Sequence, residues 1–139
     1  MQNLATKKVI ASVIKKDGKF LIAQRGKKDA LYGLWEFPGG KMEEGESEKE
    51  CLKRELFEEF GIEVVVDNYL CSSFFEHKGN LTEMRAYSIS EFKGEFNLFE
   101  HQQIKWVSAE ELRSFAMPEP DAPIVEYLLL NKYRTSAYA

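Results

Sequence analysis

The chain has 139 residues, a net charge of −4 and a pI near 5.3. Its length fits one domain, and we expect residues 1–139 to form a single domain. The acidic balance argues against a protein that binds nucleic acid polymers, because phosphate contacts need clustered Lys and Arg. No apolar run reaches the roughly 18 residues of a membrane-spanning helix, so no membrane partner is expected either.

The N-terminal residues and the cysteines indicate the compartment. Residues 1–8 lack the apolar centre of a signal peptide, which predicts a protein that is not secreted. Cys51 and Cys71 have neither CxxC nor metal-ligand spacing. They are therefore expected to be free thiols in a reducing compartment, and we predict a cytoplasmic protein.

The first forty residues favour β-structure. Strands are predicted over residues 7–15 and 19–25, joined by a tight turn at Asp17-Gly18. A polar loop follows over residues 26–33. Residues 34–40 predict a short strand that ends in a turn at Gly39-Gly40, where backbone carbonyls can point outward.

A helix is predicted over residues 47–60. Ser47 with Glu50 forms a capping box, and Gly61 stands where a left-handed C-terminal cap belongs. The apolar stripe of this helix consists of Leu52, Leu56 and Phe60.

The second half continues with strands and then helices. The predicted strands are residues 62–75, 81–92 and 104–107, followed by a short helix from Ser108 and a last helix over 121–132. His77 and His101 are expected in polar turns without a functional role. This order predicts an α+β or mixed α/β domain with helices packed on a sheet.

Glutamates are concentrated on and before the first helix. Eight occur between Glu43 and Glu59. Glu55, Glu58 and Glu59 follow i, i+3, i+4 spacing, so they share one helix face and repel one another. The repulsion is relieved by raised pKa values or by a divalent cation, for which Mg²⁺ or Mn²⁺ suits carboxylate oxygens. On an arbitrary helix the same pattern is an ordinary solvated acidic face.

The segment from Gly40 to Ile62 carries a longer pattern. It is written G-x5-E-x7-R-E-U-x-E-E-x-G-U, where U is apolar, and every defined position matches. A chance match has odds on the order of one in ten million from average residue usage. The pattern resembles the signature of the Nudix hydrolases, and residues 34–41 (LWEFPGGK) resemble their MutT branch, the enzymes that sanitise the nucleotide pool.

The resemblance implies a fold and a reaction. It implies a mixed sheet flanked by helices, with the signature as loop–helix–loop, and hydrolysis of a nucleoside diphosphate linked to another group with Mg²⁺ or Mn²⁺. Glu58, Glu59 and the Gly39 carbonyl would bind metal. Glu55 would bind metal or deprotonate the attacking water, and Arg54 would tether the carboxylates.

The resemblance also suggests roles for three further residues, each with an alternative that stays open. Glu46 is expected to bond to its own loop rather than to catalyse. Glu100, six residues before Trp106, matches an additional metal-binding carboxylate, or it is an ordinary surface residue. Arg25 would supply a cation to phosphate or base, or it is a solvated strand end.

The base-reading residues are expected near Phe37 and Asp121. Trp35 and Phe37 alternate on one face of a strand; at least one should pack in the core, and Phe37 should line the nucleoside pocket. Asp121 matches a position where the bacterial 8-oxo-dGTP enzyme has Asn. An ionised carboxylate only accepts hydrogen bonds, which suits an exocyclic amine. Asp121 would suit guanine O6 only if burial raised the pKa of its carboxyl group. The alternative is a plain helix N-cap.

We therefore expect a Mg²⁺-dependent nucleoside triphosphate pyrophosphohydrolase that releases a nucleoside monophosphate and pyrophosphate. Its substrate would be a small nucleotide, either an oxidised (d)NTP such as 8-oxo-dGTP or (d)CTP, and the protein would be a monomer or weak homodimer. The alternatives are a nucleotide-sugar pyrophosphatase of the ADP-ribose type and a non-catalytic nucleotide-binding module.

Overall fold

The computed structural model describes residues 7–138, with side chains up to residue 131. The strands are β1 (Lys7–Lys16), β2 (Lys19–Arg25), β3 (Trp35–Glu36), β4 (Gly39–Lys41), β5 (Glu63–His77), β6 (Asn80–Lys93) and β7 (His101–Val107). The helices are α1 (Glu48–Phe60) and α2 (Ala122–Tyr138), with short 3-10 turns η1 (Glu110–Ser114) and η2 (Glu119–Asp121). This is the α+β fold that the sequence predicts.

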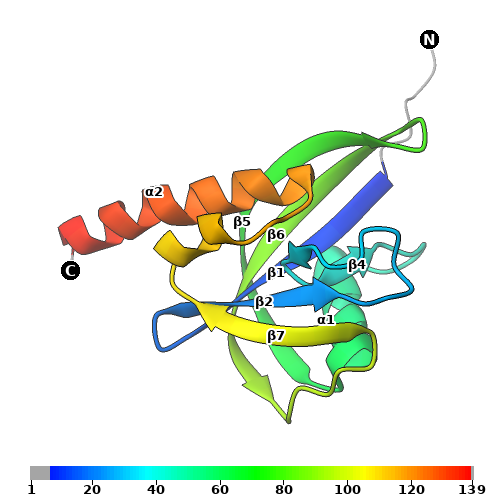
Figure 1. The fold of residues 1–139 in the computed structure, drawn as a ribbon, viewed down its shortest axis with the longest axis horizontal. Coiled ribbons are helices and arrows are strands. Elements are labelled where there is room, and N and C mark those ends of the chain that lie inside the picture. Colours follow the sequence, from blue (N-terminus) through cyan, green and yellow to red (C-terminus); the bar gives the residue numbers. More distant parts are fainter. Residues whose placement is uncertain (1–6, 139) are drawn as a thin grey trace.

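Strand β1 joins two wings of a mixed sheet (Figure 1). In one wing β1 pairs in parallel with β6 and antiparallel with β4, and β6 pairs with β5. In the other wing β2 pairs with β3 and β7. The wings are joined only where Lys15 and Lys16 pair with Phe20 and Lys19, so they diverge along the rest of β1.

The pleat of β1 divides the core into two layers. Ile10 and Ile14 pack with α1, whereas Ala11 and Val13 pack with α2. The two helices therefore cover opposite faces of the sheet (Figure 1). The predicted stripe of α1, namely Leu52, Leu56 and Phe60, is fully buried.

Local sequence signals set the element ends. The capping box of α1 is present: Ser47 Oγ accepts from Glu50 N–H at 3.1 Å, and Glu50 accepts from Ser47 N–H at 2.8 Å. Gly61 ends the helix with φ 75°, and Asp17 and Gly18 both have positive φ in the β1–β2 turn. These predictions are confirmed.

Two predicted boundaries are wrong. Gly39 and Gly40 do not form a turn; they belong to β4 and pair with Ala11 and Ile10 of β1. A Cβ on Gly39 would overlap the Ile10 carbonyl, so glycine permits this close pairing. Strand β7 begins at His101, three residues earlier than predicted, because it pairs with β2 as far as Arg25.

Two further observations concern the cysteines and the helices. Cys51 and Cys71 are free thiols, as predicted. Among the described residues, no helix is both long and apolar enough to cross a membrane.

Glu48 fastens the start of α1 to the sheet. Its carboxylate accepts hydrogen bonds from Lys8, Arg85 and Tyr87. Burial acts to raise the pKa of Glu48, but the hydrogen bonds from these three residues outweigh it and hold the pKa below its usual value. A carboxylate with a lowered pKa stabilises the fold above its unfolded-state pKa, and this contribution is lost as the pH falls through the folded-state pKa.

We therefore predict that Glu48→Gln lowers the free energy of unfolding by about 2 kcal/mol near pH 7, because charge-assisted bonds are lost. The deficit should shrink as the pH falls below the ordinary pKa of an unfolded-state glutamate, about 4.3, and through the lowered folded-state pKa of Glu48. Urea unfolding at several pH values measures this, with Glu91→Gln on the exposed surface as control. A deficit independent of pH would contradict the assignment.

Candidate active site

An open cleft of about 1910 Å³ lies where the two wings of the sheet diverge. It is lined by parts of β1, β3, β4, α1, the β5–β6 hairpin, the segment before β7 and η2. Of the predicted site residues, those that line it are Arg25, Phe37, Gly39, Glu55, Glu59, Glu100 and Asp121. Arg54 and Glu58 do not line it.

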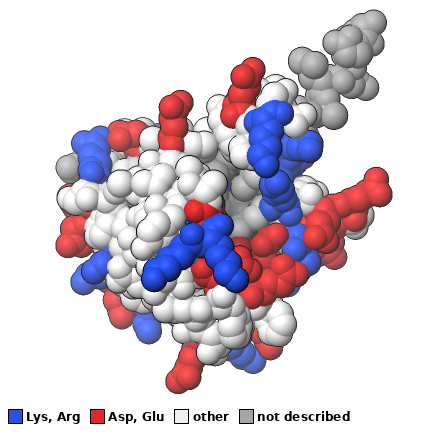
Figure 2. All heavy atoms as spheres, turned by 45° about the vertical axis from the view of Figure 1, so that its right-hand side comes forward, with Lys and Arg blue, Asp and Glu red and all other residues white. Residues whose placement is uncertain are grey.

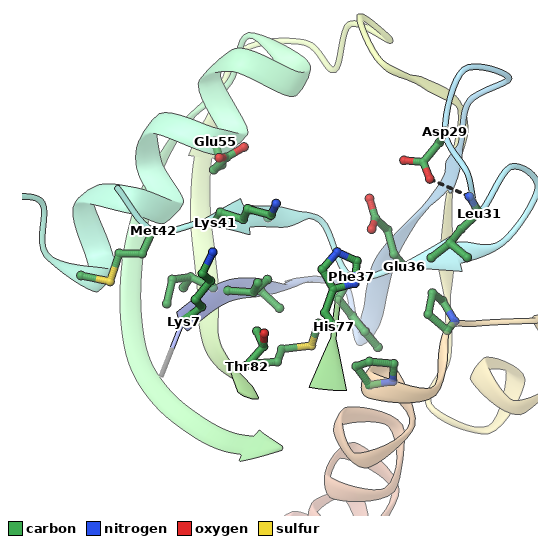
Figure 3. A pocket seen from close by; sticks show the side chains of 18 of the residues that line it. Lys7, Asp29, Leu31, Glu36, Phe37, Lys41, Met42, Glu55, His77 and Thr82 are labelled. Carbon is green, nitrogen blue, oxygen red and sulfur yellow. Dashed lines mark hydrogen bonds between the residues drawn. The ribbon is translucent and has the colours of Figure 1, made fainter. Parts of the chain in front are cut away.

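The cleft combines acidic and basic side chains. Figure 2 shows acidic groups gathered in and beside a hollow, with Lys and Arg side chains around it. In Figure 3, Glu55 reaches into the cleft from α1, opposite Lys7 and Lys41 from the sheet. Within the described part of the chain, neither lysine carries an ion pair.

Glu55 and Glu59 contact each other at the inner end of the acidic face. Glu59 is only 5% exposed, and its Oε1 atom has no hydrogen-bond partner among the residues that the structure describes. Burial raises the pKa of Glu55. Burial, together with the charges of Glu36 and Glu55, raises the pKa of Glu59 to about 10. Without a cation, this pair therefore holds a proton at neutral pH.

Arg54 links the carboxylates to the loop before α1. Its Nη1 donates to Glu55 at 3.1 Å and to Glu58 at 3.3 Å, while its Nη2 donates to the Lys41 carbonyl at 3.1 Å. The same guanidinium donates to both carboxylate oxygens of Glu46, at 3.0 and 2.9 Å. One cation thus fixes three acidic side chains and the backbone of β4.

Glu46 serves its own loop in this structure. It accepts from the Glu43 N–H at 2.7 Å as well as from Arg54. The hydrogen bonds from Arg54 and from the Glu43 N–H lower its pKa to about 2. Glu46 therefore remains an anion that holds the loop against α1.

The pairing of β4 determines where the Gly39 carbonyl points. Pro38 accepts from β1 at 2.8 Å and Met42 donates to β1 at 3.0 Å, so alternate residues bond to β1. Gly39 and Lys41 therefore present their carbonyls at the opposite, free edge. The Lys41 carbonyl meets Arg54 there. The Gly39 carbonyl leaves β4 at that same edge, and Gly39 is one of the residues that line the cleft.

Gly40 makes room for Glu55. A Cβ at this position would overlap the Glu55 carboxylate. Since that carboxylate is the mobile end of a side chain, a methyl group here would displace Glu55 rather than the strand. At Gly39 the overlap is with the backbone of Ile10, which cannot move without breaking the β1–β4 pairing.

We predict that Gly40→Ala weakens the acidic site with little loss of stability, whereas Gly39→Ala destabilises the fold. Thermal unfolding in EDTA and Mn²⁺ titration of the two purified variants separate the effects. Equal stability losses in the two variants would contradict the prediction.

His101 lies in the site. The prediction that it lies in a polar turn is therefore wrong. It begins β7, is 8% exposed, and its Nε2 lies 2.7 Å from Glu36 Oε2 and 3.9 Å from Glu59 Oε1. Glu36 itself was not predicted. The only sequence signal for Glu36 is its position one residue before Phe37. Its hydrogen-bond partners come from other strands that are distant in the sequence.

Arg25 is paired rather than free. Its Nη2 lies 2.7 Å from Glu36 Oε1, and its Nη1 lies 2.8 Å from Asp29. Its guanidinium thereby holds one end of Glu36 in the cleft wall.

Glu100 and His77 lie at the rim of the cleft. Glu100 is exposed, lines the cleft directly before β7, and its charge contributes to the raised pKa of Glu59. His77 ends β5 at the tip of the β5–β6 hairpin and also lines the cleft (Figure 3).

Phe37 and Asp121 are joined at the other end of the cleft. Asp121 Oδ2 accepts from the Phe37 N–H at 3.0 Å. Asp121 directly precedes α2, at the predicted N-cap position, but this bond crosses to the loop after β3. Asp121 is 2% exposed, and burial raises its pKa to about 7, with Glu36 adding to the rise and Phe37 and Arg25 opposing it.

The prediction that at least one of Trp35 and Phe37 packs in the core is confirmed. Trp35 and Phe37 are 7% and 2% exposed and pack in the core layer under α2. Phe37 also forms part of the cleft lining.

Comparison with known proteins identifies the family. Residues 9–127 match the model of the NUDIX domain. The chain belongs to the Nudix family. The expected family is thereby confirmed, and the site described above carries its signature residues.

Two curated relatives cover most of the Nudix chain. The CTP pyrophosphohydrolase of Escherichia coli K12 is 41% identical over 118 residues, which cover 85% of this chain and 87% of the relative. The 8-oxo-dGTP diphosphatase of Buchnera aphidicola (subspecies Schizaphis graminum) is 35% identical over 121 residues, 86% of this chain and 91% of the relative.

Solved structures share the fold. The solution structure of the E. coli ORF135 protein matches with a TM-score of 0.84 and 38% identity, covering 91% of each chain. A structure from work on MutT of Aliivibrio salmonicida and Vibrio cholerae matches with a TM-score of 0.75 and 28% identity, covering 91% of this chain and 98% of the other.

The donor set fits the divalent metal that Nudix hydrolases generally use. Glu59 Oε1 is a buried carboxyl oxygen to which no described residue donates a hydrogen bond, and Glu55 faces it. Carboxylate and carbonyl oxygens are the ligands that Mg²⁺ and Mn²⁺ prefer. A divalent cation would replace the proton that the crowded pair otherwise holds.

Proposed function

We propose that this Nudix protein is a Mg²⁺- or Mn²⁺-dependent nucleoside triphosphate pyrophosphohydrolase acting on (d)CTP or on an oxidised (d)NTP such as 8-oxo-dGTP. The observation that carries this proposal is the contact between half-buried Glu55 and buried Glu59, which line the same cleft as the Phe37–Asp121 pair. The relatives named CTP pyrophosphohydrolase and 8-oxo-dGTP diphosphatase support this substrate class.

The metal would be held by the carboxylates of Glu55, Glu58, Glu59 and Glu100 and by the Gly39 carbonyl. When bound, the cation supplies positive charge that polarises phosphoryl oxygens and lowers the pKa of the attacking water. Glu55 serves either as a ligand or as the base that accepts the water proton. Arg54 keeps Glu55 and Glu58 in place for either role.

The cleft floor provides direct cations for the phosphate chain. Val9 pairs with Lys41, and Lys7 precedes Val9 by two residues, so both lysines lie on one face of the sheet. Since neither has an acidic partner within the described residues, a triphosphate can neutralise them. The lysines therefore favour a polyanionic substrate in an otherwise acidic cleft.

The Phe37–Asp121 pair would read the base edge. Phe37 N–H fixes one oxygen of Asp121, and the carboxyl group titrates near neutral pH. In its neutral form Asp121 can donate as an amide does, which suits guanine O6. In its ionised form it only accepts, which suits the exocyclic amine of cytosine.

A substrate panel tests the proposed function. We expect a higher kcat/KM for pyrophosphate release from dCTP or 8-oxo-dGTP than for hydrolysis of ADP-ribose. In Glu58→Gln we expect kcat/KM for the triphosphate to fall about a hundredfold, which is part of the several kcal/mol of transition-state stabilisation that a metal supplies. Glu63→Gln, on the exposed face of β5, is the control. Fast ADP-ribose hydrolysis with inert triphosphates would favour the nucleotide-sugar alternative. Binding without any turnover would favour a non-catalytic module.

A pH series tests the role of Asp121. We predict that the ratio of kcat/KM for dCTP to that for 8-oxo-dGTP rises from about pH 6 to about pH 8, as the carboxyl group ionises. The ratio cancels pH effects on steps common to both substrates. Asp121→Asn, which does not titrate, should flatten the ratio and shift it toward 8-oxo-dGTP. An unchanged ratio in the variant would mean that Asp121 only holds Phe37.

A further inference from the structure

We propose that His101 is a positioning residue of this site, which fixes Glu59 and the Glu100 segment relative to each other so that the carboxylates bind a divalent cation. This inference rests on the proposed function, because it concerns the same metal site. It starts from a buried imidazole that the reaction scheme above does not use.

The imidazole is held on two sides. Its ring stacks on Phe60 with centroids 5.1 Å apart and planes inclined by 12°. Its Nε2 bonds to Glu36 at 2.7 Å, across the cleft wall. Since Phe60 follows Glu59 directly on α1, the stack fixes β7 against the helix turn that carries the buried carboxylate.

The same ring sets the position of Glu100. Glu100 is exposed and directly precedes His101, so its backbone is placed by the first anchored residue of β7. The Glu100 carbonyl also packs closely on Gly26, where a Cβ would overlap it. His101 therefore connects two proposed ligands that lie far apart in the sequence.

The hydrogen bonding shows how His101 acts on Glu59. Glu36 is held at one oxygen by Arg25 and at the other by His101, so the imidazole donates its Nε2 proton to Glu36. At 3.9 Å, the same edge faces Glu59 Oε1 without bonding to it. Glu59 thus keeps a free oxygen for a cation while Glu36 is fixed beside it.

Direct metal ligation by His101 is the competing arrangement. Glu36, Glu59 and His101 each offer one ligand atom, and these atoms lie within 4.8 Å of one another. A cation bound to the His101 Nε2 atom would have to displace the hydrogen bond between His101 and Glu36. The existing bonds therefore favour positioning, which for residues that orient ligands is worth about 10- to 100-fold in metal affinity.

Mn²⁺ titration without nucleotide, by calorimetry and electron paramagnetic resonance, tests the proposal. His101→Phe keeps a stacking ring but loses the donor, and we expect its Kd for Mn²⁺ to rise about 10- to 100-fold. His101→Gln restores an N–H donor and should bind within a few-fold of the wild type. Gln103→Leu, which removes an exposed side-chain donor from the same strand outside the cleft lining, is the control and should bind as the wild type does.

The outcomes separate the proposals. Wild-type affinity in His101→Phe overturns the positioning role, as does a directly coordinated imidazole nitrogen in the Mn²⁺ spectrum of the wild type. Equal weakening in the Phe and Gln variants also overturns it. If the Phe variant does not fold in EDTA, His101→Asn, whose amide falls short of Glu36, replaces it. Absence of Mn²⁺ binding by the wild type, or binding unchanged in Glu59→Gln, overturns the proposed function itself.

Discussion

Two carboxylates in contact and largely removed from water impose the constraint on which this site depends. Glu59 is 5% exposed and has an oxygen without a donor, while Glu55 lies against it. Like charges at this separation and depth cannot both ionise unless a cation compensates them. The arrangement is therefore stable as a proton-sharing pair or as a metal site.

The surrounding structure maintains this strained arrangement of charge. Arg54 supplies one fixed cation to Glu55 and Glu58, and Gly40 leaves space for Glu55 because it has no side chain. The divergence of the two sheet wings opens the cleft next to α1. On the far side of the cleft, burial raises the pKa of Asp121, which accepts from the Phe37 N–H, to about 7.

Much of the fold follows from local signals. The capping box at Ser47 and the left-handed cap at Gly61 bound α1, and its apolar stripe determines which face is buried. The Gly39-Gly40 pair was less informative, because glycine suits both a turn and a close strand pairing. The start of β7 was also missed, since the residues before Ile104 are polar and only pairing with β2 makes them a strand.

The sequence by itself determined the family, the element order and the acidic face of α1, because these depend on spacings of a few residues along one chain segment. Only the tertiary structure decided which of those acids is buried and what surrounds it. Glu36, His101 and Glu59 come from three separate elements, and nothing in their sequence spacing shows that they meet. The pKa of Asp121 was likewise undecided, because desolvation depends on the whole packed neighbourhood and not on adjacent residues.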